Sequence, residues 1–346
     1  MELRELRIVH VNDVASVGAN LVSGLCDIGV NAKLYRLLNY KNEKFPKILQ
    51  YVISTILRVI EIFRFKQYIK NEKINLIHIH YGTHAYLPLF FGFPFFLHIH
   101  GTDVRIHIHW PILGKIIRSG IEKAESVFYT TPDLKPLVEK IRPDAIFFPN
   151  PIDTEQFIPR TDFEFQDTPV LFNINKIDRF KGIGEVLKSI ELVWNEYPKI
   201  KVKMFNYGNA MEEVKEFLNK YEGDSRLVLL SRTPHKKMIS TIQDSTFILG
   251  QIGTGILTVS ELEGMACGKP VICNFKYANM YLEFPPVLIA NTPEEARDQM
   301  LFLLNNPVEG QKIGEKARKW IMEYFDTRIV AKKLLDVYSR HLMQKT

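Results

Sequence analysis

A glycine-rich loop that runs into a predicted helix is the first stretch of this 346-residue chain with residues suited to chemistry. The apolar run 247–249 is typical of a buried strand, and the loop 250–257 follows it. Thr258 and Glu261 have the spacing of a capping box, which predicts a helix start. Free N–H groups and the positive dipole end at such a start favour a phosphate. An ordinary strand–helix connection has the same pattern, so both interpretations stay open at this point.

Histidines are the second group of candidates, because three His-Ile-His triplets follow one another. The triplets occupy residues 78–80, 98–100 and 107–109. Alternate residues of a strand share a face, so each pair has a spacing that suits a metal ion. No carboxylate or cysteine stands at ligand spacing, so we expect no metal site. His10, His80 and His100 come near the ends of predicted strands, where parallel sheets bind ligands, and a role in the core is the alternative for each.

The elements that must position these side chains alternate between strands and helices. Residues 7–11 form a predicted strand, 14–27 a helix and 30–37 a second strand, which indicates a parallel sheet. The helix after the glycine-rich loop should end at Gly268, because glycine tolerates the left-handed conformation found there. Gly18 lies early in the first connection, where a missing side chain would let a phosphate approach the backbone, although glycines inside helices are common.

Length and composition restrict the class of protein. The chain is long enough for two domains, and 46% hydrophobic with 24% charged residues is typical of a globular protein. No apolar stretch reaches the roughly 20 residues that span a bilayer, and residues 1–5 lead directly into a strand, so we expect neither a membrane span nor a signal peptide. The three cysteines favour reduced thiols and a cytoplasmic protein. The net charge of +6 suits anionic partners, but no nucleic-acid-binding motif is present.

Residues 44–73 form a predicted amphipathic helix with basic residues outside its apolar stripe. The stripe consists of Ile48, Leu49, Val52, Ile53, Ile56, Leu57, Ile60 and Phe63. One interpretation is a helix that packs on the sheet through this stripe. The other is an interfacial helix that rests on anionic lipid, which would make the protein peripheral on the inner face of the cell membrane.

Residues 261–272, ELEGMACGKPVI, closely resemble the E-A-M-A-C-G-K-P-V-I stretch of the retaining, nucleotide-sugar-dependent glycosyltransferases of family 4. Four further stretches resemble other segments of that family. They are 76–82 (LIHIHYG), 100–103 (HGTD), 147–153 (FFPNPID) and 175–182 (NKIDRFKG). The resemblance implies the α/β GT-B fold, in which two Rossmann-like, doubly wound parallel-sheet domains face each other across a cleft. It also implies glycosyl transfer with retention of configuration, without a bound metal or other cofactor.

The resemblance assigns the donor nucleotide sugar to the second half of the chain. Glu263 would hydrogen-bond the ribose hydroxyls, and Lys176 and Lys181 would clamp the diphosphate. Lys176 replaces the family's usual arginine and lacks its bidentate fork. Arg179 is therefore an alternative to Lys176 as the cation that acts with Lys181. The other donor contacts implied here are Gly208, His235, Thr254 and Gly255.

In the first half, the resemblance places His100 over the donor sugar, close to the reacting centre. Gly18 would contact the donor phosphate, and Asp103 would orient its loop or contact a substrate. The residues expected on the acceptor side are His10, His80 and Arg105.

One position departs from the family. The family pattern has two glutamates with seven residues between them, and the first contacts the sugar hydroxyls. Counting back from Glu263 leads to Gly255, which cannot make that contact. Gln251, Thr254 or Glu261 could compensate, although Glu261 is the expected helix cap. The loss of this glutamate puts in question which sugar is bound and whether the protein is active. The diphosphate site does not depend on this glutamate.

The predicted organisation has four parts. They are an acceptor-binding domain (1–158), a linker (159–169), a nucleotide-sugar-binding domain (170–325) and a final helix (326–346) that crosses back to the first domain. The predicted function is transfer of a sugar from a nucleotide-sugar donor to a glycan or lipid-linked acceptor. Two alternatives are a non-catalytic nucleotide-sugar-binding paralogue or subunit, and a GT-B-fold sugar-nucleotide epimerase.

Overall fold

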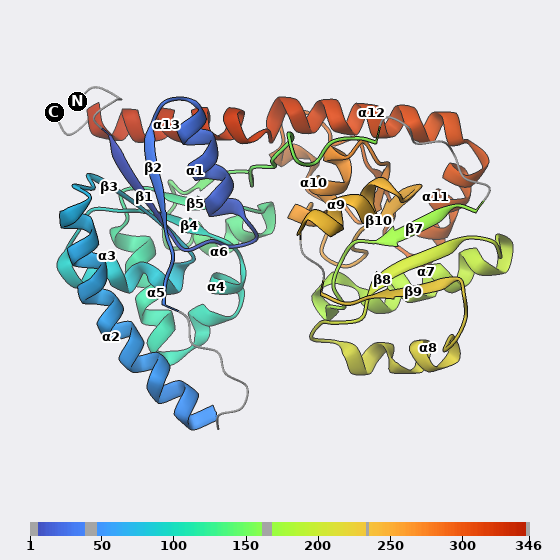
Figure 1. Ribbon diagram of the computed structural model, residues 1–346, viewed down its shortest axis with the longest axis horizontal. Helices are drawn as coiled ribbons and strands as arrows, with labels where there is room; N and C mark the ends of the chain where they lie inside the picture. The colour runs from blue at the N-terminus through green and yellow to red at the C-terminus, as the bar shows by residue number, and fades with distance from the viewer. Residues whose placement is uncertain (1–5, 39–46, 161–167, 233–234, 344–346) are drawn as a thin grey trace. The chain divides into compact units, whose positions relative to one another are not determined.

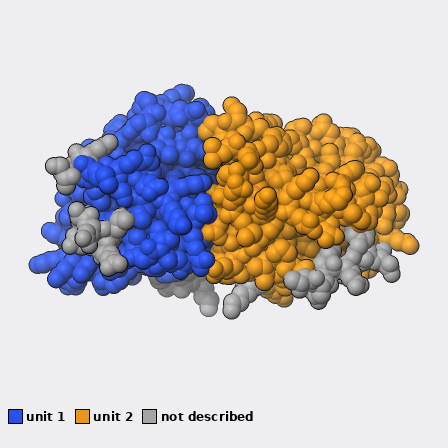
Figure 2. All heavy atoms as spheres, turned by 90° about the horizontal axis from the view of Figure 1, so that it is seen from above, with its two compact units in different colours: residues 1–151, 327–346 blue, residues 152–326 orange. Residues whose placement is uncertain are grey.

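Two compact units divide the chain, and each contains one six-stranded parallel sheet with helices packed against it (Figures 1 and 2). The computed structural model describes residues 6–38, 47–160, 168–232 and 235–343. Unit 1 comprises residues 1–151 and 327–346, and unit 2 comprises residues 152–326. The expected fold class, two Rossmann-like parallel-sheet domains, is confirmed. Residues 152–158, expected in the first domain, lie in unit 2.

The sheet of unit 1 has the strand order β2-β1-β3-β4-β5-β6. Its strands are β1 (Arg7–Val11), β2 (Asn31–Tyr35), β3 (Leu76–His80), β4 (Phe96–Ile99), β5 (Val127–Tyr129) and β6 (Ile146–Phe147). The order reverses between β1 and β3, because β2 lies on one side of β1 and all later strands lie on the other. At such a switch point the carboxyl ends of two strands leave a crevice in which doubly wound proteins bind ligands. His10 on β1 and His80 at the end of β3 flank this crevice.

The helices of unit 1 come from both ends of the chain. They are α1 (Val17–Asp27), α2 (Lys47–Asn71), α3 (Tyr86–Phe91), α4 (Thr102–Arg105), α5 (Pro111–Lys123), α6 (Lys135–Val138) and α13 (Thr327–Met343). The first and last of these pack closely together, since a Cβ on Gly24 would lie 2.5 Å from the backbone oxygen of Thr327. Tyr338 of α13 reaches His78 on β3, so the C-terminal helix covers the sheet face that carries this histidine.

The sheet of unit 2 has the order β12-β11-β10-β7-β8-β9, with its switch point between β7 and β10. Its strands are β7 (Val170–Asn173), β8 (Lys201–Phe205), β9 (Leu227–Leu230), β10 (Phe247–Leu249), β11 (Val271–Cys273) and β12 (Leu288–Ile289). Its helices are α7 (Ile183–Glu196), α8 (Lys215–Lys220), α9 (His235–Gln243), α10 (Val259–Ala266), α11 (Pro293–Asn305) and α12 (Pro307–Tyr324). Successive residues of β7 contribute to two apolar clusters, Leu171 to one with α7 and α11, and Phe172 to one with α10 and α12. Both faces of the sheet are therefore buried.

The helix predicted after the glycine-rich loop is confirmed with its caps. It is α10, its N-cap is Thr258, and Thr258 and Glu261 form the expected capping box. Gly268 follows its end with a φ of +68°, the left-handed conformation that favours glycine.

The packing of α2 differs from the interpretation in which its apolar stripe faces the sheet. Ile56 and Phe63 are 54% and 60% exposed, and Val59 and Ile60 are about as open. Phe65 and Glu61 occupy the buried face instead. No helix within the described residues is long and apolar enough to cross a membrane.

A buried carboxylate explains this orientation of α2. Glu61 accepts hydrogen bonds from the hydroxyl of Tyr35 (2.5 Å), the backbone N–H of Leu38 (2.5 Å) and the guanidinium of Arg64 (2.9 Å). These bonds join α2 to β2 and the segment after it. Ile56, Ile60 and Phe63 of the apolar stripe consequently remain open, because rotating them inward would leave the carboxylate without partners.

Replacing Glu61 by alanine should destabilise unit 1 by about 2–4 kcal/mol, because the Tyr35 hydroxyl and the Leu38 N–H would lose a buried acceptor. Urea denaturation followed by hydrogen exchange in unit 1 measures this loss. The matched control is Glu72→Ala directly after the same helix, which removes the exposed ion pair with Lys33 and should have a much smaller effect. Equal losses in the two variants would contradict the role given to Glu61.

Candidate functional site

The candidate donor site of unit 2 lies at the switch point of its sheet, where the segments after β7 and β10 meet. A Cβ added to Gly182 would lie 2.8 Å from the backbone nitrogen of Gly253, and the converse distance is the same. The backbone N–H of Ile252 donates to the carbonyl of Lys181 at 3.2 Å. The loop that carries the candidate cations and the glycine-rich loop therefore form one continuous surface.

Lys181 lies at the centre of this surface. Its Nζ donates to Oδ1 of Asn175 and, at 3.3 Å, to Oγ1 of Thr258, the N-cap of α10. Asn175 donates in turn to the carboxylate of Glu261 at 2.7 Å. Burial lowers the pKa of Lys181, and the Glu261 carboxylate opposes that shift. An ammonium group beside a helix N-terminus suits an anion, because the lysine charge and the helix dipole act on it together.

The two other expected cations stand in ion pairs with carboxylates. Nζ of Lys176 lies 3.5 Å from Oδ2 of Asp178, and about half of its side chain is exposed. The charge of Lys176 also lowers the pKa of Lys181, after the larger effects of burial and of Glu261. Arg179 is 80% exposed and pairs with Glu213.

Gln251 organises the glycine-rich loop. Its side-chain oxygen accepts from the N–H groups of Gly253 (3.0 Å) and Thr254 (2.7 Å). Its side-chain nitrogen donates to the carbonyls of Ile256 (2.9 Å) and Asn274 (2.5 Å). The amide is used within the protein, which argues against Gln251 as the replacement for the family's first glutamate.

Gly255 stands where the family has that glutamate, and its backbone explains the departure. Its φ is +74°, and a Cβ would lie 2.8 Å from the Lys276 side chain. Glu261 does not replace the lost carboxylate, because it is buried and accepts from the N–H groups of Thr258 (2.9 Å) and Gln251 (3.1 Å). Glu263 is 5% exposed on the same helix, one turn from the loop.

Gly208 closes the cation loop on its other side. It forms a β-bridge with Ile177, and a Cβ at this position would lie 1.7 Å from the Ile177 carbonyl oxygen. Only glycine permits this approach. His235 begins α9, but its side chain lies outside the described part of the chain.

Five histidines and Tyr338 form a cluster at the switch point of unit 1. Cross-strand neighbours are His10 with His78 and His80 with His98. The hydrogen bonds run in order from His100 Nε2 to His80 Nδ1 (3.0 Å), His80 Nε2 to His10 Nδ1 (2.9 Å), His10 Nε2 to Tyr338 Oη (3.4 Å), Tyr338 Oη to His78 Nδ1 (2.6 Å) and His78 Nε2 to His98 Nδ1 (3.3 Å). A single chain of hydrogen bonds thus connects His100 with helix α13.

The same rings are close enough together to be considered as metal ligands. The nitrogens of His10, His78 and His80, and those of His80, His98 and His100, lie within 4.8 Å of one another. However, the His10 and His78 rings stack at 11°, and the His80 and His98 rings at 22°. Lone pairs lie in the ring planes, so stacked rings direct them along nearly parallel lines rather than toward one tetrahedral centre. The geometry fits a hydrogen-bonded chain better than a metal centre.

Asp103 holds the loop that carries His100. Its buried carboxylate accepts from the backbone N–H groups of Gly82 (3.1 Å), His100 (3.1 Å), Gly101 (2.7 Å) and Val104 (3.1 Å). Burial raises the pKa of Asp103, and these four bonds oppose the shift. Of the two roles expected for Asp103, the observed bonds correspond to orientation of the loop.

Arg105 and Gly18 are engaged within unit 1 as well. Arg105 Nη2 lies 2.6 Å from Oδ2 of Asp133, and most of its side chain is buried. A Cβ on Gly18 would lie 2.7 Å from the carbonyl oxygen of Asn12, so the missing side chain lets α1 lie against the end of β1. The connection between β1 and α1 is itself strained, because Asn12, Ala15 and Ser16 all have positive φ (72°, 49° and 63°).

A cavity of about 740 Å³ opens beside this strained connection. Its polar lining includes Asp13, Arg36, Arg58 and His84, and apolar residues of α2 and α5 complete it. Burial lowers the pKa of His84 to about 4, and the Arg58 charge adds to that shift. Glu61 also lines this pocket, so two carboxylates accompany the two arginines, and apolar walls surround them.

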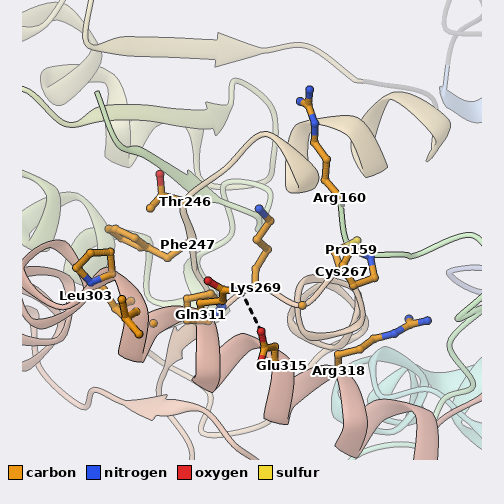
Figure 3. A pocket seen from close by; sticks show the side chains of 15 residues that line it. Pro159, Arg160, Thr246, Phe247, Cys267, Lys269, Leu303, Gln311, Glu315 and Arg318 are labelled. Carbon is orange, nitrogen blue, oxygen red and sulfur yellow. Dashed lines mark hydrogen bonds between the residues drawn. The ribbon is translucent and has the colours of Figure 1, made fainter. Parts of the chain in front are cut away.

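A separate cavity of about 490 Å³ in unit 2 is shown in Figure 3. Thr246 and Lys269 line it, and each precedes a strand, β10 and β11 respectively. This cavity therefore lies at the amino ends of the strands, opposite the glycine-rich loop. Burial lowers the pKa of Lys269 to about 8.

The fold and the residues matched to known proteins define a glycosyltransferase with the GT-B fold. Sucrose-phosphate synthase from Thermosynechococcus elongatus superposes with a TM-score of 0.75 at 14% identity, over 99% of this chain and 100% of that one. Anabaena HepE in complex with UDP-glucose gives 0.71 at 10% identity, over 97% and 100%. Residues 155–320 match the model of the family "Glycosyl transferases group 1". The second half of the chain is therefore similar to the group 1 glycosyltransferases.

Curated relatives agree with this assignment. An uncharacterized glycosyltransferase of Methanocaldococcus jannaschii is 22% identical over 88% of both chains. A phosphatidylinositol N-acetylglucosaminyltransferase subunit of Arabidopsis thaliana is 22% identical over 64% of this chain and about half (52%) of its own length. N-acetyl-alpha-D-glucosaminyl L-malate synthase of Bacillus anthracis is 20% identical over 78% and 75%.

Sequence reasoning missed two groups that shape the candidate sites, Asn175 and Tyr338, and gave a third, Gln251, a different role. Asn175 links Lys181 to Glu261, Gln251 shapes the glycine-rich loop, and Tyr338 completes the histidine chain. Asn175 and Gln251 directly follow or nearly follow predicted strands, which is a usable signal. No sequence signal pointed to Tyr338, because its hydrogen-bond partners lie more than 250 residues earlier in the chain.

Unit 1 should lose stability steeply below about pH 6.5. Burial lowers the pKa of all five clustered histidines, to about 3 for His10 and His100. The unfolded chain takes up protons near pH 6.5 and the folded chain does not, so stability is complete above that pH and falls as the pH decreases. Each histidine contributes about 1.4 kcal/mol per pH unit.

Hydrogen exchange and urea denaturation at pH 7.5 and pH 5.5 test this expectation. Unit 2 is the internal control, because only His235 of the ten histidines lies in it. Loss of protection in residues 7–151 with little change in residues 170–326 is the expected result. Parallel loss in both units would mean that the histidine cluster does not cause the pH dependence.

Proposed function

We propose that the protein transfers a glycosyl residue from a UDP-sugar to an acceptor held by unit 1, with retention of configuration and without a bound metal ion. The observation that carries this proposal is Lys181 beside the N-terminus of α10, with Lys176 as its neighbour, at the switch point of the second sheet. UDP is favoured as the nucleotide because a structural neighbour was solved with UDP-glucose. Two relatives are named for N-acetylglucosaminyl groups, so UDP-N-acetylglucosamine is the first donor to test.

The proposed roles follow from charge and hydrogen bonding. As the bond between the sugar and the diphosphate breaks, negative charge grows on the diphosphate, and the two lysines with the helix N-terminus stabilise it. Glu263 binds the ribose hydroxyls, since a carboxylate accepts two hydrogen bonds from a vicinal diol. His100 contacts the sugar near its anomeric carbon as a neutral imidazole, because burial lowers its pKa to about 3.

The acceptor is proposed to bind in the cavity of about 740 Å³ in unit 1. Arg36 and Arg58 suit an anionic headgroup, and the exposed apolar stripe of α2 adjoins the cavity through Leu57. The Arabidopsis relative is named for phosphatidylinositol, which has this combination of an anionic headgroup and an apolar body. We therefore propose a lipid-linked acceptor, reached by a protein that rests on an anionic membrane through α2.

A donor screen tests the transferase activity. UDP-, GDP- and ADP-sugars are incubated with the protein and EDTA, and nucleotide release and product anomeric configuration are followed by NMR. We expect release of UDP that persists in EDTA. Binding without turnover on any membrane extract would favour a non-catalytic paralogue, and interconversion of donor sugars would favour an epimerase; both contradict the proposal.

Lys181→Met should weaken UDP binding about 10- to 100-fold, because a charged hydrogen bond to a phosphate contributes about 1.5–3 kcal/mol. Isothermal titration calorimetry measures the change. The control is Lys188→Met in α7, an exposed lysine that pairs with Glu294, and its affinity should stay within about twofold. Equal affinities for both variants would remove the main support for the donor site.

Membrane binding should depend on the open face of α2. In flotation with vesicles containing anionic lipid, the wild-type protein is expected to rise with the vesicles, and Phe63→Asp to remain in the soluble fraction. Phe302→Asp, at an exposed aromatic residue of unit 2, is the control and should float. Wild-type protein that stays soluble at low salt would contradict the membrane proposal.

A further inference from the structure

We infer that the buried chain from His98 through Tyr338 to His100 fixes the tautomer of His100, so that this side chain presents an Nδ1–H donor to its ligand. Tyr338, His10, His78 and His98 are positioning residues in this proposal, because they act through His80 and do not touch the ligand. The part that concerns catalysis rests on the proposed contact of His100 with the donor sugar. The tautomer itself is a property of the protein alone.

The chain has only two self-consistent proton arrangements. A neutral imidazole has one N–H and one lone pair, and a hydroxyl both donates and accepts. His10, His78 and His80 each use both ring nitrogens within the chain, and the Tyr338 hydroxyl lies between His10 and His78. The described residues offer the buried Tyr338 hydroxyl no other acceptor, so its proton goes to one of these two rings. If one bond then reverses, all the others must reverse as well. The orientation chosen at one end therefore determines the orientation at the other.

The His98 end selects one arrangement. Its Nε2 is buried and has no hydrogen-bond partner among the described residues. The rings around His98 are the imidazoles of the cluster and, at 5.7 and 5.9 Å between ring centroids, the apolar rings of Phe128 and Phe148. A buried N–H without a partner costs more than a bare lone pair, since orphaned donors are the rarer defect in folded proteins. Nε2 of His98 is thus the unprotonated nitrogen, and Nδ1 carries the proton that His98 donates.

This choice propagates through the cluster. His98 donates to His78, His78 to the Tyr338 oxygen, and the Tyr338 hydroxyl to His10. His10 then donates to His80, and His80 donates from Nδ1 to Nε2 of His100. The proton of His100 must consequently be on Nδ1, the nitrogen that the chain does not use.

The chain does not serve as a proton conductor. A proton that entered at His100 would have to leave from Nε2 of His98. That nitrogen has no hydrogen-bond partner among the described residues, and Phe128 and Phe148 lie beside its ring. The histidines instead hold one orientation, and cooperative polarisation along the chain strengthens it. His100 can then offer a donor to a sugar oxygen and cannot take a proton through its bonded nitrogen.

The charged and titratable groups around His100 are few in the described structure. His80 faces it from β3 and His98 from β4. Asp103 on α4 accepts from its backbone N–H, and the guanidinium of Arg105 lies beside Gly101. Asp103 is engaged with four N–H groups, and Arg105 is paired with Asp133, so neither supplies a proton to the ring.

Nitrogen NMR of the full-length protein labelled with ¹⁵N-histidine tests the tautomer without any donor or acceptor. The His100 signals are assigned by their loss in His100→Asn. We expect a protonated Nδ1, an unprotonated Nε2 and no titration between pH 6.5 and pH 8, where unit 1 is expected to remain folded. A proton on Nε2, titration in that range, or a stoichiometric transition metal in the purified protein would overturn the inference.

Tyr338→Phe tests the coupling, with Leu334→Val as the matched control. Leu334 lies one turn earlier on α13, is fully buried and has no polar side-chain atoms, so its truncation reproduces a packing loss without interrupting the chain. We expect shifted His100 nitrogen signals only in Tyr338→Phe, with a kcat about tenfold lower and a little-changed KM for the donor. Unshifted His100 signals in Tyr338→Phe, or equal shifts in both variants, would overturn the proposal. An absence of transferase activity would instead count against the proposed function, because the NMR result does not require turnover.

Discussion

Buried polar side chains that satisfy one another are the interactions on which both candidate sites depend. A buried donor or acceptor without a partner costs more than an ordinary hydrogen bond contributes, so these groups allow few arrangements. In unit 2, Glu261 fixes the start of α10 and, through Asn175, the place of Lys181. In unit 1, Asp103 fixes the loop of His100 by accepting four backbone N–H groups. Lys181 and His100 therefore lie on loops whose positions are fixed by buried hydrogen bonds.

The same topological rule places both sets of residues. Each sheet reverses its strand order once, between β1 and β3 in unit 1 and between β7 and β10 in unit 2. The segments after these strands cannot cover the sheet edge there, because they lead away on opposite faces. The histidine cluster lies at the first reversal, and the lysine loop meets the glycine-rich loop at the second. Two unrelated chemistries, neutral imidazoles and paired cations, thus occupy equivalent places in two similar sheets.

Features with a local cause could be predicted from the sequence. The capping box at Thr258, the end of α10 before Gly268 and most strands follow from neighbouring residues and periodicity. The orientation of α2 could not, because a stripe of apolar residues does not reveal that Glu61 would be buried by Tyr35 and Leu38. The central member of the histidine chain could not be predicted either, since Tyr338 meets His10 and His78 only after the protein has folded.

The candidate site shows the same division. The motif identified Lys181, whereas the hydrogen bond by which Asn175 positions Lys181 is evident only from the structure. For Asp103, the motif left two roles open, and the four backbone bonds account for its carboxylate.

The left-handed backbone at Gly255 has a consequence for the history of the protein. A substitution that introduced the family's glutamate would place a bulky residue where φ is +74° and where Lys276 already fills the space. Such a substitution would be unfavourable until the neighbouring loop had changed first.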